Sequence, residues 1–108
     1  MMSWSVELVN ELIKNVEQWF IDKNLDKGDS FRQLSKTTEE LGEVASALNK
    51  NNITELKDGI GDVTVTLIGI ALQNNLTLEE CLGYAYNEIK DRTGKTVNGV
   101  FVKESDLG

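Results

Sequence analysis

The sequence predicts an all-α domain of four helices followed by a short C-terminal β-hairpin. Apolar residues recur at helical spacing in four segments, polar turns separate these segments, and the chain contains no proline. Its 108 residues are the length of one ordinary domain, which we expect to span residues 1–108. A domain this short has little core of its own, so a partner copy would add to its stability.

The first two helices are predicted from amphipathic stripes. The first is expected over residues 6–20, with an apolar stripe formed by Val9, Leu12, Ile13, Val16 and Phe20. The polar segment 23–30 is expected to be a loop in which Asp29 or Ser30 caps the next helix. The second is expected over about residues 31–49, with a buried stripe formed by Leu34, Leu41, Ala45 and Leu48, beside Phe31 and Thr38.

The third segment carries conflicting signals. Residues 63–68 are rich in β-branched side chains and alternate like a strand, whereas residues 55–73 contain no turn signal except isolated glycines. The uninterrupted length favours a helix, and Asn52 with Glu55 resembles a capping box at its start. A helix that is apolar on nearly all sides is buried on nearly all sides, which in a short chain predicts an obligate oligomer.

The C-terminal region is predicted to contain the fourth helix and the hairpin. Thr77 and Glu80 are placed as an N-cap and its reciprocal partner, and Gly94 is expected to end the helix soon after Arg92. The core stripe is expected from Leu78, Leu82, Ala85 and Ile89. Asn98-Gly99 between two short apolar segments is typical of a two-residue hairpin turn.

Charge and composition exclude several classes of function. With 18 acidic and 11 basic residues the net charge is −7, which argues against binding a nucleic acid polymer or an anionic membrane. The single cysteine, Cys81, cannot form an internal disulfide, and this fits a reducing compartment. Neither a secretory signal nor an apolar run long enough to span a bilayer is visible, so we expect a cytoplasmic protein.

Acidic residues gather in two segments that carry the candidate chemistry. Glu39, Glu40 and Glu43 point to one side of the second helix, and Asp58 and Asp62 lie one turn apart on the third. One interpretation is a solvated face, with Asp58 stabilised by the helix dipole. Two features oppose it, because Asp62 adjoins a strongly apolar run and poor helix formers stand beside the acids, at Gly42, Gly59 and Gly61.

If the two acidic faces meet, they form a site with oxygen ligands only. Such a site favours a hard cation, Mg²⁺ or alternatively Mn²⁺, over zinc. The chain has no histidine, which excludes a di-iron bundle built on Glu-x-x-His pairs and removes histidine from acid–base catalysis. A carboxylate cage could bind polyphosphate through the metal and position a water molecule.

The motifs resemble those of a known family. Glu-Glu-Leu-Gly-Glu at 39–43, followed by Gly-Asp-Val at 61–63, looks like the Glu-Glu-x-x-Glu and Glu-x-x-Asp signature of the MazG-like, all-α nucleotide pyrophosphohydrolases. The similarity extends over residues 33–104 and includes residues 85–92 and the Gly-Val-Phe-Val-Lys-Glu ending. It implies a four-helix MazG-like bundle completed by oligomerisation, as a homodimer or homotetramer. It also implies cleavage of nucleoside triphosphates, ribose or deoxyribose, to monophosphate and pyrophosphate.

The resemblance also implies roles for the acids. Glu40, Glu43 and Asp62 match metal ligands, Glu43 being essential to catalysis as well, and Glu39 matches a further ligand or the base that orients water. The family usually has glutamate three residues before Asp62, where this chain has Gly59. Asp58 is the obvious substitute as the fourth metal ligand.

The phosphates are expected to meet basic and amide groups, although each of these, taken singly, is more often a solvated surface residue. The candidates are Lys36, Asn87, Lys90, Arg92 and Lys95. Trp4, Trp19 and Phe31 are candidates for stacking on a base, but aromatic side chains on amphipathic helices more often lie in the core.

Two other hypotheses compete with this enzyme. One is a catalytically silent helical dimer that binds a nucleotide or a protein partner, which the departure at Gly59 supports. The other is a hydrolase of a different nucleotide polyphosphate, such as an alarmone.

Overall fold

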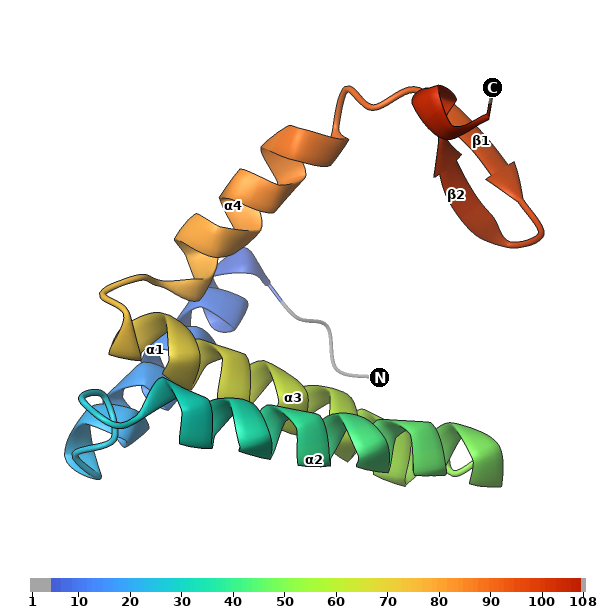
Figure 1. Cartoon of the computed structure of the whole chain (residues 1–108). Helices are drawn as coiled ribbons and strands as arrows, with labels where there is room; N and C mark the ends of the chain where they lie inside the picture. Colours follow the sequence, from blue (N-terminus) through green and yellow to red (C-terminus); the bar gives the residue numbers. More distant parts are fainter. Residues whose placement is uncertain (1–4, 108) are drawn as a thin grey trace. The chain divides into compact units, whose positions relative to one another are not determined.

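A computed structural model describes residues 5–107 and divides into two compact units, Met1–Leu78 and Glu79–Gly108. The first unit contains helices α1 (Val6–Asp22), α2 (Ser30–Lys50) and α3 (Ile53–Gln73) (Figure 1). Next come α4 (Leu78–Ile89), strands β1 (Gly94–Val97) and β2 (Val100–Lys103), and the short 3₁₀ helix η1 (Glu104–Asp106). The predicted fold class, all-α with a C-terminal hairpin, is confirmed.

The helices of the first unit begin at side-chain caps. Asp29 accepts a hydrogen bond from the Phe31 backbone N–H at 2.9 Å, and Asn52 accepts one from the Glu55 N–H at 3.0 Å, as the sequence predicts. Asn51, with φ of 54°, ends α2 in the left-handed conformation that asparagine adopts more readily than most residues. Two asparagines therefore make the tight connection between α2 and α3.

The contact between α1 and α3 is apolar. Phe20 of α1 is 2% exposed and lies against Gly69, where a Cβ atom would come within 2.5 Å of its ring. Ile68 and Ala71 of α3 are also buried. Glycine at position 69 therefore lets the phenylalanine ring rest on the helix backbone.

The contact between α2 and α3 contains polar groups. The helices run side by side in Figure 1, and the Thr37 hydroxyl lies 2.9 Å from that of Thr66, which itself donates to the Val63 carbonyl oxygen at 2.7 Å. Nearby, a Cβ at Gly59 would come within 3.0 Å of Val44 Cγ2, so the missing side chain permits close approach of the helices.

The predicted buried stripe of α2 is wrong for the single chain. Every member is exposed: Phe31, Leu34, Thr38, Leu41, Ala45 and Leu48, with Leu41 at 57%. The less exposed face, about a quarter-turn away, is formed by Gln33, Thr37, Glu40, Val44 and Ala47. α2 thus turns a partly polar face to α3 and leaves its apolar face without cover within its own unit.

Residues Ile53–Gln73 form one continuous helix, as the uninterrupted length of this segment predicts. The β-branched residues within it, which are typical of a strand, do not interrupt the helix. Its buried residues are Gly59, Thr66, Ile68, Gly69 and Ala71, which lie on more than one side of the helix. The expected burial on nearly all sides is not found in the single chain, because Ile53, Ile60 and Leu67 are exposed. These three follow each other at seven residues, as do Leu34, Leu41 and Leu48 of α2.

No helix within residues 5–107 is long and apolar enough to cross a membrane.

In the second unit, α4 ends at Ile89, and the predicted helix end at Gly94 is wrong. Gly94 instead begins β1, opposite Lys103, where a Cβ would collide with the Val102 carbonyl oxygen. The predicted hairpin is confirmed, with Asn98 and Gly99 at φ of 52° and 78° as a two-residue turn requires.

Candidate active site

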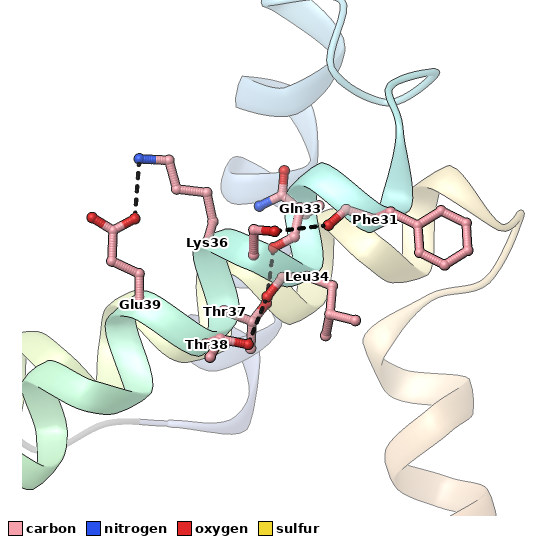
Figure 2. A network of polar contacts seen from close by, with 8 residues as sticks. Phe31, Gln33, Leu34, Lys36, Thr37, Thr38 and Glu39 are labelled. Carbon is pink, nitrogen blue, oxygen red and sulfur yellow. Dashed lines mark hydrogen bonds and ion pairs between the residues drawn. The ribbon is translucent and has the colours of Figure 1, made fainter.

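The first half of α2 presents two chemically different sides. Figure 2 shows Lys36 and Glu39 leaving the helix on one side, while Phe31 and Leu34 point away from them. Lys36 Nζ lies 3.7 Å from Glu39 Oε2, and both side chains are exposed. Glu39 is therefore open to solvent with a cation beside it, although an exposed pair of this kind contributes little to stability.

Glu40 occupies the less exposed face of α2. Its Oε2 atom is buried and has no hydrogen-bond partner among residues 5–107. Loss of water raises the pKa of Glu40 above its usual range, and the neighbouring carboxylates of Glu43, Asp62 and Glu39 raise it further. The structure thus brings four predicted carboxylates into one electrostatic group, and one of them has a buried oxygen without a donor.

Two clefts extend this group along α3. A polar cleft of about 350 Å³ is lined by Glu43, Ser46, Lys50, Glu55, Asp58 and Gly59. A larger one, of about 600 Å³, is lined by Thr54, Glu55, Lys57, Asp58, Gly61, Asp62 and Val65. Asp58 borders both clefts, with Glu43 in the first and Asp62 in the second. The acids of α2 and α3 therefore do adjoin, as expected from the sequence if the two faces meet.

Sequence reasoning missed the basic residues of these clefts. Lys50 lines the first cleft and lies 3.9 Å from Glu55, joining the end of α2 to the start of α3. Its spacing of seven from Glu43, with Ser46 between them, places all three on one side of a helix and could have identified it. Lys57 lines the second cleft, directly before Asp58.

The remaining predicted phosphate-binding residues lie in the second unit. Asn87 is on α4, Lys90 and Arg92 follow that helix, and Lys95 is on β1, and all four side chains are exposed. Their role beside the carboxylates stays a prediction. Of the predicted cations, Lys36 is the one in the first unit.

The carboxylates supply the oxygen ligands that a hard cation prefers, but they do not converge on one position. Within residues 5–107, no three side chains among Asp, Glu, His and Cys stand close enough together to hold a metal ion. The donors are nevertheless all oxygen, and the unpartnered Glu40 oxygen needs a hydrogen-bond donor or a cation. Glu40, Glu43 and Asp62, with Asp58 at the edge, are the residues that could supply ligands.

Gly59, where the sequence departs from the MazG-like pattern, has a packing role. It is buried, and its backbone lies against Val44 of α2. A glutamate here would have to displace that contact. Asp58, one residue earlier, is exposed and faces the clefts instead.

Comparison with known protein families gives a match over most of the chain. The model of the phosphoribosyl-ATP pyrophosphohydrolase family matches residues 6–92, which include all three helices of the first unit and α4. The chain belongs to this family.

One relative comes from a bacteriophage. An uncharacterised 18.2 kDa protein of the rep-hol intergenic region of Haemophilus phage HP1 (strain HP1c1) is 41% identical over 69 residues. The aligned part covers 63% of this chain and 42% of the relative, so the chain matches less than half of the relative's length. No solved structure matches the chain.

Proposed function

We propose that this protein is a MazG-like, magnesium-dependent pyrophosphohydrolase that cleaves nucleoside triphosphates to a monophosphate and pyrophosphate. The observation that carries the proposal is the buried, unpartnered oxygen of Glu40 inside a group of carboxylates at the α2–α3 contact. A cation would relieve the mutual repulsion of these carboxylates, and a polyphosphate substrate adds further negative charge to a chain of net charge −7.

In this proposal Glu40, Glu43 and Asp62 would hold the metal, with Asp58 contributing directly or through water. Magnesium, when bound, supplies neutralisation of the phosphate charge and lowers the pKa of a bound water. Manganese could take its place at oxygen ligands. Side-chain rotation would have to bring the carboxylates onto the ion, since positions in ligand-free sites are commonly looser than in the working complex.

The other residues of the site would bind and orient the substrate. Glu39, which is exposed and lies 3.7 Å from Lys36, would accept a proton at its Oε2 atom from the attacking water. Lys36, and Lys50 in the first cleft, would pair with phosphate oxygens. That Asn87, Lys90, Arg92 and Lys95 bind phosphate stays a prediction from the sequence.

We also propose that the working form is a homodimer or homotetramer. The exposed apolar side chains at seven-residue spacing on α2 and α3 are the kind of surface that pairing of helices covers. Sedimentation should show at least a dimer at low micromolar concentration. A folded monomer under those conditions would contradict this part of the proposal.

The experiment that tests the activity combines substrates, metals and product analysis. Purified protein would be incubated with Mg²⁺ or Mn²⁺ and a panel containing ribo- and deoxyribonucleoside triphosphates, phosphoribosyl-ATP and a nucleoside tetraphosphate. Pyrophosphate and orthophosphate would be assayed separately. Release of pyrophosphate that stops on addition of a chelator supports the proposal, and a preference for phosphoribosyl-ATP would move the substrate to the one that names the family.

A catalytically silent nucleotide-binding dimer is the alternative. Two observations favour it, the burial of Gly59 against Val44 and the open arrangement of the acids within residues 5–107. It expects nucleotide binding by calorimetry without turnover of any member of the panel. The same set of assays therefore separates the two functions.

A further inference from the structure

An apolar slot lies between α1 and α3, apart from the two acidic clefts. It has a volume of about 320 Å³ and is lined by Leu12, Asn15, Val16, Trp19 and Val65. This volume is at the lower end of the range, about 300–1,000 Å³, of small-molecule sites in proteins. Although Asn15 is among the lining residues, the surface of the slot is almost wholly apolar, so the slot is suited to the face of a flat apolar group.

Trp19 is not the core residue that its place in an amphipathic helix predicts. Its side chain is 49% exposed, whereas the neighbouring Phe20 is 2% exposed. The two rings meet edge to face, with centroids 5.2 Å apart and an interplanar angle of 89°. Phe20 is itself fixed against Gly69. Trp19 therefore presents indole surface at the slot from a well-anchored segment of α1, and such surface is a stacking platform for planar ligands.

The slot adjoins the acidic site through Val65. This residue lines both the slot and the larger cleft, which contains Asp58 and Asp62. Asp62 and Val65 are separated by three residues, which corresponds to about 4.5 Å along a helix. An apolar surface and a carboxylate group are thus neighbours on one side of α3. A nucleotide has the matching order, with a planar base joined through a sugar to phosphates.

We propose that the slot between α1 and α3 binds the base of the nucleotide whose phosphates are bound at the carboxylates. Trp19 stacks on the face of the base, and Leu12, Val16 and Val65 pack around it. The proposal rests on the proposed function for the position of the phosphates. It adds the group that selects nucleotides over other polyphosphates.

The test compares a substrate that has a base with one that has none. Hydrolysis of a nucleoside triphosphate and of inorganic tripolyphosphate would be measured with magnesium for wild type, Trp19→Ala and Trp19→Phe. Loss of a base-stacking aromatic weakens binding by about 5- to 150-fold. We expect Trp19→Ala to raise KM for the nucleoside triphosphate by such a factor and to leave KM for tripolyphosphate unchanged, with Trp19→Phe in between. Tyr84→Ala, which removes an exposed ring of α4, is the matched control and should change neither value.

A second measurement does not depend on turnover. The chain has two tryptophans, so replacing Trp4 with phenylalanine leaves Trp19 as the one indole reporter. Nucleoside monophosphate should quench its fluorescence, and ribose 5-phosphate should not. An equal KM change for both substrates, or no quenching by the monophosphate, would overturn the slot. If no substrate is hydrolysed but the monophosphate still quenches, the enzymatic function fails and the base site stands.

Discussion

The two contacts that α3 makes within the first unit are built in opposite ways. Against α1 the contact is apolar, with the Phe20 ring packed on Gly69. Against α2 the contact includes paired threonine hydroxyls and the Glu40 carboxyl with its unpartnered oxygen. The first contact gains stability from close packing, while the second sacrifices stability to keep carboxylates together. Helix α3 thus makes a closely packed apolar contact on one side and contributes candidate active-site residues on another.

The largest expected effect comes from a substitution in the polar contact between α2 and α3. Glu43→Gln should abolish hydrolysis while leaving the helical circular dichroism spectrum intact, since it removes a ligand charge and keeps the shape. The loss should exceed the roughly 10–100-fold typical of a residue that acts through a ligand. Glu79→Gln, an exposed acid in the first turn of α4, is the control and should retain activity. Undiminished turnover by Glu43→Gln would refute the carboxylate cage.

Asp58→Asn should have an intermediate effect. Asp58 borders both clefts but is exposed, so we expect turnover and magnesium affinity to fall about 10–100-fold, as for a residue at one remove from the ion. Magnesium titrations of activity in wild type and variant measure this change. An unchanged magnesium midpoint would leave Asp58 as a helix-end acid, whose removal costs about 0.3–1 kcal/mol of stability.

Gly69→Ala tests the apolar contact between α1 and α3. A methyl group there would meet the Phe20 ring at 2.5 Å, and overpacking of this kind costs about 1–3 kcal/mol. Thermal melting should show a fall of several degrees. Gly42→Ala on α2 is the matched control, because nothing lies within 4 Å of its added Cβ and alanine favours the helix by up to about 1 kcal/mol. Equal melting temperatures of the two variants would mean that the close approach of Phe20 does not matter.

Glu40→Gln tests the polar contact between α2 and α3 through the dependence of stability on pH. The raised pKa of Glu40 means that the folded state binds this proton more tightly than the unfolded state. The stability of the metal-free protein should therefore decline as pH rises from the usual glutamate range through the raised pKa of Glu40. Glu40→Gln should remove this decline and melt at a higher temperature than wild type at neutral pH in chelator.

The exposed Glu11→Gln on α1 is the control for that pH series. It should keep the wild-type decline, because Glu11 is not among the charges that act on Glu40. A Glu40→Gln variant that melts below wild type without metal would show that the carboxylate stabilises the contact.

The sequence predicted local structure better than it predicted which faces meet. Helix caps at Asp29 and Asn52 and the Asn98-Gly99 turn depend on neighbouring residues, and these were right. The apolar stripe around Leu41 predicts a core face, because apolar residues usually mark the buried side of a helix. Apolar periodicity identifies a face to be covered without identifying the element that covers it.

The candidate site could be predicted in its acids but not in its surroundings. The spacing from Glu39 to Glu43 and from Asp58 to Asp62 was enough to expect two carboxylate faces, and Glu40 is grouped with Glu43 and Asp62. The exposed position of Trp19 could not be foreseen, and the spacing of Lys50 from Glu43 places it on the acidic side of α2 without showing that a cleft lies there. Both depend on how α1 and α2 lie against α3, which is a tertiary property.

The tight connection at Asn51 and Asn52 has a consequence for how the chain folds. It joins two helices of 21 residues each, so the carboxylates of α2 and α3 are brought together by contacts that are near in sequence. Closing so short a loop costs little entropy, and local helical pairs form on the microsecond timescale or soon after. The electrostatic repulsion between these carboxylates therefore acts on one of the earliest structures to form. Divalent cations present during refolding should accelerate the pairing of α2 with α3.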